Sequence, residues 1–280
     1  MTVDSWLFKL LTFYGTRLHH RGQWRILGLL RRWLRADVDA ELEVVRDGHR
    51  WVLNPADYVR AELFWFGLRD PWDVFHAKTF LRPGSVVFDI GANFGHYSIT
   101  LGDAINRQCS VHAFEPFPEN LARLRKNIAL NNMAATIHVH PVGLSDAVGI
   151  GVMTTRMDNS GSATLARTGV EDGFEVQLTT LDAFCLAEQI DRVDFMKIDV
   201  EGFETKLLDG AVDTIDRHHP TILIELDPPK LTRAGSSVEI LASTLRSFGY
   251  TLYVANRKRL VPLESLPQGQ DILNAFCICK

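Results

Sequence analysis

Residues 86–98, VVFDIGANFGHYS, are the most informative segment of this chain for its fold. It reads as a buried apolar strand that reaches an acid, turns through two glycines and enters a helix. In a doubly wound sheet such a turn lies at the carboxyl end of a strand, where ligands bind. Glycine at positions 91 and 95 allows positive φ angles and a close approach of the backbone to a ligand. The spacing Asp-x-Gly-x-x-x-Gly differs from the Gly-x-Gly-x-x-Gly of dinucleotide sites, which counts against a dinucleotide.

The remainder of the chain after Pro83-Gly84 alternates predicted strands and helices. Apolar runs predict strands at residues 86–90, 110–114, 136–142, 193–198, 221–226, 250–255 and 272–279, with helical segments between most of them. This alternation predicts an α/β fold with a mostly parallel, doubly wound sheet covered on both faces. The last two runs are joined by a stretch too short for a parallel crossover, so we expect an antiparallel hairpin at the end of the sheet.

Residues 1–60 form a separate N-terminal extension in this interpretation, and residues 61–280 form the main domain. Apolar residues recur at helical spacing in residues 6–34, interleaved with basic side chains, which predicts one or two amphipathic basic helices. Such helices either pack on the main domain or contact anionic lipid or a partner helix. Residues 41–53 alternate around Asp47-Gly48, which predicts a hairpin with a tight turn. Residues 64–80 are rich in aromatic side chains and are expected to be helical.

The composition is that of an ordinary globular protein. Of 280 residues, 46% are hydrophobic and 23% are charged, and the formal charge of -4 gives no reason to expect nucleic acid as a partner. The four cysteines show no Cys-x-x-Cys spacing, which indicates reduced thiols. No apolar run reaches the ~18 residues of a membrane span, and the first residues do not resemble a signal peptide. We therefore expect a cytoplasmic protein.

Carboxylates follow several predicted strands. Glu115, with Pro116 after it, ends the second strand and has the chain position of an acid that accepts hydrogen bonds from an adenosine ribose. Asp199 and Glu201 follow the strand at 193–198, where they suit either a ligand site or the start of a helix. Glu225 ends the next strand in the same way. The pattern predicts a nucleoside-containing ligand.

The motifs FDIGANFGHYS, AFEP, TTLDAF, FMKIDVEGFE and ILIELDP, in this order, closely resemble the FkbM family of S-adenosylmethionine-dependent methyltransferases over residues 63–228. KIDVEGFE is the most specific of them. The resemblance implies a class I methyltransferase, Rossmann-like sheet of seven strands with an antiparallel last strand, and S-adenosylmethionine as cofactor. It also implies which residues bind the cofactor. The methionine part would be contacted by Asp89, Gly91, Asn93 and Gly95. The ribose would be contacted by Glu115 with Pro116, and the adenine by Ser145 and Asp146.

The acceptor side of the site needs a base if the acceptor is an alcohol, because the hydroxyl must lose a proton. The catalytic candidates are Asp199, Glu201, Glu225 and His96, of which we favour Asp199. His96 alternatively shapes the pocket wall from the first turn of a helix. We assign no metal, although the three acids could converge on one. Polar residues 153–165 are interpreted as a loop, either over the acceptor or simply at the surface.

Three functions compete on this reading. The first is O-methylation of a hydroxyl on a small molecule or on a glycan- or lipid-linked metabolite, as the resemblance implies. The second is a nicotinamide-dependent oxidoreductase, and the third is a non-catalytic S-adenosylmethionine-binding or membrane-recruiting module. A nucleic-acid methyltransferase is disfavoured, because Asp227-Pro228-Pro229 continues with Lys230 where base-directed enzymes place an aromatic residue. The sequence leaves open the acceptor and whether the chain forms a homodimer.

Overall fold

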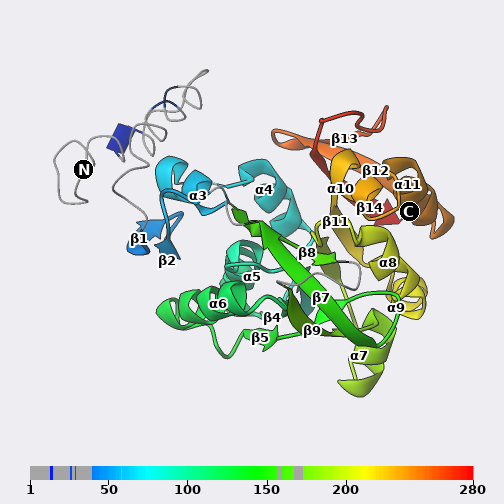
Figure 1. Cartoon of the computed structure of the whole chain (residues 1–280), viewed down its shortest axis with the longest axis horizontal. Helices are drawn as coiled ribbons and strands as arrows, with labels where there is room; N and C mark the ends of the chain where they lie inside the picture. The colour runs from blue at the N-terminus through cyan, green and yellow to red at the C-terminus, as the bar shows by residue number, and fades with distance from the viewer. Residues whose placement is uncertain are drawn as a thin grey trace. The chain divides into compact units, whose positions relative to one another are not determined.

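The computed structural model of this chain describes residues 40–57, 59–67, 69–156, 159–166 and 173–279, with the single positions 13, 14, 26 and 29. The basic helices expected in residues 1–35 therefore lie almost entirely outside the described residues. The chain divides into two compact units, whose helices and strands are labelled in Figure 1. One comprises Met1–Pro71 with Arg156–Ser162, and the other comprises Trp72–Thr155 with Ala163–Lys280.

The first unit contains the predicted hairpin. Strands β1 (Leu42–Arg46) and β2 (His49–Leu53) pair antiparallel, with Arg46 opposite His49. Asp47 and Gly48 between them have φ angles of 46° and 77°, which are the positive values that a type I′ turn requires. The prediction from this dipeptide is confirmed.

Residues 64–80, which were expected to be helical, comprise the end of one helix and the whole of a second, with a break between them. Helix α3 (Arg60–Phe66) ends at Gly67, whose left-handed φ of 73° closes the last turn. Helix α4 (Pro71–Thr79) begins at Pro71, a residue suited to the first position of a helix. Gly67 and Pro71 are sequence signals for a helix end and a helix start, but they were not recognised because the segments on both sides are rich in aromatic residues.

The second unit is built on an eight-stranded sheet of order β13-β12-β14-β11-β10-β3-β4-β5. Neighbours from β11 to β5 pair parallel, whereas β14 runs antiparallel to both β11 and β12. This is the predicted doubly wound sheet with an antiparallel last strand, so the fold class is confirmed. The strand beyond the predicted seven is β13, an edge strand that pairs with β12. The bounds are β3 (Ser85–Ile90), β4 (Cys109–Phe114), β5 (Ile137–His140), β10 (Phe195–Ile198), β11 (Thr221–Leu226), β12 (Tyr250–Asn256), β13 (Arg259–Pro262) and β14 (Leu273–Cys279).

Helices cover both faces of this sheet. Along β3, Asp89 faces α5, where it bonds to Ser98, while the alternate residues Phe88 and Ile90 belong to the apolar cluster on the opposite face. Most strands are connected through helical segments, as a parallel sheet requires. The helical segments of this unit, besides α4, are α5 (His96–Gly102), η1 (Ala104–Arg107), α6 (Pro118–Leu130), α7 (Leu181–Ala187), α8 (Glu204–Asp209), α9 (Val212–His218), α10 (Pro228–Arg233) and α11 (Val238–Ser247).

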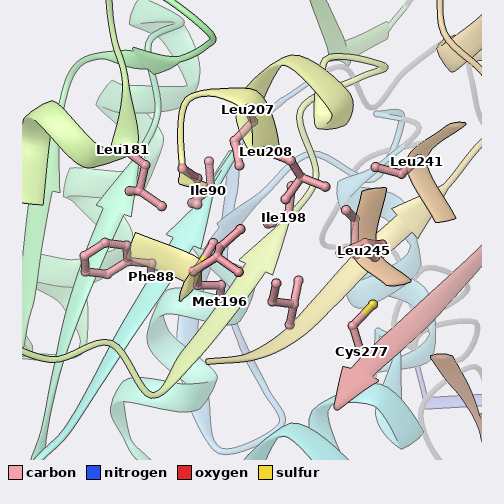
Figure 2. Packing of buried hydrophobic residues seen from close by; sticks show 14 of the residues in the cluster. Phe88, Ile90, Leu181, Met196, Ile198, Leu207, Leu208, Leu241, Leu245 and Cys277 are labelled. Carbon is pink, nitrogen blue, oxygen red and sulfur yellow. The ribbon is translucent and has the colours of Figure 1, made fainter. Parts of the chain in front are cut away.

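A large apolar cluster lies between the sheet and the helices α7, α8, α9 and α11. Figure 2 shows Phe88, Met196 and Ile198 of the strands packed beside side chains of α7, α8 and α11. Full burial of such a side chain stabilises the fold by about 1.5–3 kcal/mol. This cluster holds the strand ends in register, and the site described below lies at their carboxyl edge.

A second sheet, of order β6-β9-β7-β8, was not predicted. Its strands are β6 (Gly143–Leu144), β7 (Gly149–Arg156), β8 (Asn159–Ala166) and β9 (Phe174–Thr179), with β9 parallel to β6 and antiparallel to β7. The interpretation of residues 153–165 as a loop was therefore wrong. Their polar, glycine-containing sequence carries little local strand signal, because strand propensity depends strongly on context. Strand β7 pairs with β9, further along the chain, and β8 lies beside β7 at the edge of this sheet.

All four cysteines are free thiols. No helix in the described part of the chain has the length and apolar character needed to cross a bilayer.

Candidate active site

The turn between β3 and α5 contains three residues with positive φ: Gly91 at 82°, Asn93 at 51° and Gly95 at 94°. A Cβ atom on Gly91 would lie 1.9 Å from the carbonyl oxygen of Asp199, and one on Gly95 would lie 2.7 Å from Cδ1 of Leu124. The expected positive φ angles are therefore present. The backbone of the turn after β10 lies so close to Gly91 that no side chain fits at this position. Packing within the protein is therefore sufficient to require glycine here.

Four backbone amides of the β3–α5 turn, those of Gly91, Ala92, Asn93 and Gly95, donate to acceptors within the protein. The N–H groups of Gly91 and Ala92 donate to the carbonyl oxygen of Phe114 at 3.0 and 2.9 Å, and Asn93 donates to Oε2 of Glu115 at 2.8 Å. A pyrophosphate site needs such N–H groups directed at the ligand. This turn therefore offers a poor site for a dinucleotide.

Glu115, directly after β4, joins the β3–α5 turn to the start of α6. While Oε2 accepts from Asn93, Oε1 accepts from the N–H of Phe117 at 2.9 Å. The side chain is buried, and this burial raises the pKa of Glu115 to about 7 against the effect of the two amide hydrogen bonds, which lower it. The side chain of Asn120 also donates to this carboxylate. A lone pair still remains, so Glu115 can accept from a ligand hydroxyl.

Asp89 and Lys197 are buried charges on neighbouring strands. Oγ of Ser98 donates to Oδ2 of Asp89 at 2.5 Å, and burial raises the pKa of Asp89 to about 6 despite this bond. The Lys197 ammonium group lies 5.3 Å from the centroid of the Tyr97 ring and 3.7 Å from Oδ2 of Asp199. It therefore stabilises negative charge at the ends of β3 and β10.

His96 is the first residue of α5 and is buried among aromatic rings. Its ring lies 5.2 Å from that of Tyr97 and 6.3 Å from that of Phe94, measured between centroids. The structure places His96 in the packing at the start of the helix, at the end of the turn that contains Asn93.

The turn after β10 contains Asp199 and Glu201. Glu201 has a left-handed φ of 57° and Gly202 has a φ of 103°. A left-handed conformation at a residue other than glycine costs about 1–3 kcal/mol and persists only where neighbouring groups enforce it. Here the buried Glu204 carboxylate accepts hydrogen bonds from the N–H groups of Val200 at 3.2 Å and Gly202 at 3.1 Å.

The ammonium group of Lys230 gathers three carboxylates. Its Nζ lies 2.6 Å from Oε2 of Glu225, 3.0 Å from Oε2 of Glu201 and 3.4 Å from Oδ2 of Asp227. Burial opposes the charge on Lys230, but the carboxylates of Glu225 and Glu201 outweigh it and raise the pKa of the ammonium group. Burial, with Asp199 nearby, raises the pKa values of Glu201 and Glu225, whereas Lys230 lowers them.

The residues expected near adenine lie at the start of the second sheet. Ser145 is buried, its N–H donates to the carbonyl oxygen of Thr179 at 3.0 Å, and its Oγ donates to Oδ1 of the exposed Asp146 at 2.9 Å. A Cβ on Gly210 would lie 2.1 Å from the Ser145 carbonyl oxygen. Pro116 lies beside Gly143, whose Cβ would be 3.7 Å from Cγ of the proline.

Among the residues that the structure describes, no three or more His, Cys, Asp or Glu side chains are arranged to hold a metal ion. Two of the acids that could have converged on a metal, Glu201 and Glu225, converge on Lys230. The ammonium group supplies the positive charge that these carboxylates need.

Four polar residues of this region received no role from sequence reasoning: Lys197, Ser98, Glu204 and Lys230. Lys197 offered a signal, because a lysine at a buried strand position needs a nearby acid. Glu204 also offered one, as the last acid of KIDVEGFE. Lys230 offered none, since its partners depend on how α10 follows β11.

Comparison with known proteins gives one family. A family model for the methyltransferase FkbM domain matches residues 89–252, which is more than half of the chain. The match begins at Asp89 and ends in β12, so it includes both turns described above.

Curated proteins and solved structures are similar to the chain, among them the following three. The AMB antimetabolite synthetase AmbE of Pseudomonas aeruginosa is 25% identical over 88% of this chain, which covers 12% of that protein. The 31-O-demethyl-FK506 methyltransferase FkbM of Streptomyces tacrolimicus is 31% identical over 48% of this chain, which covers 62% of its length. The crystal structure of a methyltransferase FkbM from Methylobacillus flagellatus is 18% identical with a TM-score of 0.46, over 96% of this chain and 57% of that one. The chain thus spans less than two thirds of each curated relative.

Proposed function

Because this chain belongs to the methyltransferase FkbM domain family, we propose that it transfers the methyl group of S-adenosylmethionine to a hydroxyl group. The acceptor is a small molecule or a glycan- or lipid-linked metabolite. One observation carries the choice of cofactor: four amides of the β3–α5 turn are bonded internally, while carboxylates line the carboxyl edge of the sheet. This arrangement favours a cationic nucleoside over a pyrophosphate.

The residues present fit the proposed cofactor. S-adenosylmethionine carries a sulfonium, an amino group and a ribose diol, and carboxylates suit all three as acceptors or counter-charges. Glu115 would accept from a ribose hydroxyl through its remaining lone pair, with Pro116 following it. Asp89, Gly91, Asn93 and Gly95 would surround the methionine part. Ser145 and Asp146 would lie toward the adenine.

When bound, S-adenosylmethionine supplies an activated methyl group on a good leaving group. What the chain must add is alignment of the acceptor and removal of its proton, the latter worth about 10²–10⁴ in rate. Asp199 is our choice for the base. Its side chain is 29% exposed, against 19% for Glu201 and 17% for Glu225, and the latter two are bound to Lys230. His96 remains the fourth candidate.

The Streptomyces relative is named a 31-O-demethyl-FK506 methyltransferase, which supports oxygen as the atom that accepts the methyl group here. The -4 charge of the chain supports a small-molecule acceptor over a nucleic acid.

The proposal is tested first by calorimetric titration of the full chain with S-adenosylhomocysteine, with NAD in a parallel cell. We expect S-adenosylhomocysteine to bind at roughly micromolar affinity or better and NAD not to bind. Binding of NAD alone would favour an oxidoreductase, and binding of neither would favour a non-catalytic recruiting module.

A second experiment addresses the acceptor. Transfer of a radiolabelled methyl group from S-adenosylmethionine is measured against parallel panels of hydroxylated, amine-bearing and carboxylate-bearing compounds. We expect label in hydroxylated compounds. Label confined to amines or carboxylates would contradict O-methylation while leaving methyl transfer intact.

A further inference from the structure

Glu204, the last acid of KIDVEGFE, occupies an unusual position for a carboxylate. It is the first residue of α8, and 2% of its surface is exposed. Its Oε1 accepts two backbone hydrogen bonds, from Val200 at 3.2 Å and from Gly202 at 3.1 Å. Its Oε2 is buried and has no hydrogen-bond partner within the described part of the chain. Burying a carboxylate oxygen that accepts no hydrogen bond is destabilising. Any stabilisation by Glu204 must therefore come from Oε1, which accepts two hydrogen bonds.

The two amides that Glu204 binds flank Glu201, the residue with a left-handed φ of 57°. On the other side, the carbonyl oxygen of Lys230 would lie 2.6 Å from a Cβ on Gly202, so only glycine fits beneath α10. Lys230 also pairs with the Glu201 carboxylate at 3.0 Å. The turn is therefore held from two directions, by Glu204 through its backbone and by Lys230 through the Glu201 side chain.

We propose that Glu204 is a positioning residue, which holds the turn of residues 199–202 in its left-handed conformation by accepting the N–H groups of Val200 and Gly202. The consequence is that the Asp199 and Glu201 carboxylates stay beside Lys197 and Lys230 at the carboxyl edge of the sheet. This inference rests on the proposed function in one respect, that Asp199 and Glu201 serve the acceptor.

A simple helix-start role explains Glu204 less well. An acid that only complements the start of a helix acts from an exposed position, as Glu239 in the first turn of α11 does. Glu204 is instead enclosed, and burial raises its pKa to about 7, with Asp199 and Glu225 adding to the effect of burial. What it needs for the proposed role is an acceptor oxygen at the right reach, and not a negative charge.

The test compares Glu204→Met, which removes the acceptor at similar length, with Glu204→Gln, which keeps an acceptor oxygen and loses the charge. In Glu204→Asp the side chain is one methylene shorter, so the carboxylate no longer reaches the two amides. This variant replaces the Met variant if the latter does not fold. Glu239→Met is the control for loss of an acid at a helix start. Residue-resolved amide hydrogen exchange is measured by NMR for Val200 and Gly202, with the amides of β3 and β11 as internal references.

We expect the Met and Asp variants to raise exchange at Val200 and Gly202 by roughly tenfold or more, with the reference strands unchanged. The Gln variant and the Glu239 control should exchange like wild type. With a hydroxyl acceptor, kcat of the Met variant should fall about 10²-fold, because the carboxylates of Asp199 and Glu201 would be displaced. The affinity of this variant for S-adenosylhomocysteine should be unchanged.

Protection of both amides in the Met and Asp variants would overturn the proposal, because the turn would then hold without Glu204. Exchange in the Gln variant as fast as in the Met variant would also overturn it, because the charge would then be the essential property. The exchange measurement needs neither cofactor nor acceptor. Failure of wild type to bind S-adenosylhomocysteine would therefore refute the proposed function separately.

Discussion

The Nζ atom of Lys230 lies 2.6 Å from Oε2 of Glu225, and this contact joins the first turn of α10 to the end of β11. The same ammonium group lies 3.0 Å from Glu201, in the turn after β10. One cation thus connects the ends of two neighbouring strands at the edge of the sheet where the proposed acceptor binds. Removing it should affect both stability and its dependence on pH.

Lys230→Met should lower the free energy of unfolding by about 1–3 kcal/mol at pH 8 and by less at pH 5. The pKa values of Glu201 and Glu225 are raised by burial, so both carboxyls are more nearly neutral at pH 5 and need less counter-charge. Urea unfolding at the two pH values measures the difference. Lys258→Met, at an exposed position, is the matched control. An equal loss at both pH values would contradict the electrostatic explanation.

Gly91→Ala should be far more destabilising than Gly84→Ala. Both glycines have nearly the same φ, 82° and 84°, so both substitutions cost backbone strain, about 1 kcal/mol. Only at Gly91 does the new Cβ meet an atom, the Asp199 carbonyl oxygen at 1.9 Å, whereas nothing lies within 4 Å at Gly84. We expect a further loss of about 1–3 kcal/mol from this overlap. Similar midpoints of urea unfolding for the two variants would contradict this prediction. They would show that the β3–α5 turn and the turn after β10 can move apart without loss of stability.

Glu115→Ala should weaken binding of S-adenosylhomocysteine by at least ~1 kcal/mol, about fivefold in Kd. The variant should also lose stability, because the buried amides of Asn93 and Phe117 lose their acceptor. Calorimetry well below the unfolding temperature separates the two effects. Glu119→Ala on α6 is the control, since that side chain is 60% exposed. Unchanged affinity in a folded Glu115 variant would remove the ribose assignment.

Asp199→Asn should leave the affinity for S-adenosylhomocysteine unchanged and lower kcat for a hydroxyl acceptor by about 10²–10⁴. The amide keeps the shape of the side chain but cannot take a proton. Transfer of radiolabelled methyl measures the rate, and Glu225→Gln run beside it tests the alternative base. A fully active Asp199 variant with an inactive Glu225 variant would move the base to β11.

The histidine pair on β4 and β5 should make stability fall in acid. Nδ1 of His112 lies 3.0 Å from Nε2 of His140, and burial with the neighbouring histidines lowers the pKa of His112 to about 4. Since the unfolded chain takes up this proton near pH 6.5 and the folded chain does not, stability is lost as pH falls from about 6.5 to 4. The loss attributable to this pair is about 1 kcal/mol after allowing for solvent screening.

His112→Gln should flatten this part of the stability curve relative to wild type, as measured by urea unfolding at several pH values. His219→Asn is the control, because His219 is exposed and asparagine tolerates its left-handed φ of 42°. Parallel curves for wild type and His112→Gln would contradict the assignment.

The class of sheet, the β3–α5 turn and the Asp47-Gly48 hairpin could all be predicted from the amino-acid sequence. Predicted strands such as residues 221–226 and 110–114 agree with β11 and β4 to within a residue. These features depend on local signals: uninterrupted apolar runs, and residues that tolerate positive φ where the chain must turn. The helix boundary at Gly67 and Pro71 was equally local and was missed because aromatic residues on both sides masked it.

The contacts of the polar residues could not be predicted from the sequence, because they depend on the tertiary structure. Gly91 needs to be glycine because of the Asp199 carbonyl, and Lys230 meets Glu201 because α10 turns back over the end of β10. Strand β7 likewise pairs with β9 in the second sheet, and the polar sequence of residues 153–165 gives no local sign of this pairing. The physical reason is the same in each case: secondary structure follows from neighbours along the chain, whereas ion pairs, close backbone contacts and edge pairing follow from how distant strand ends are brought together.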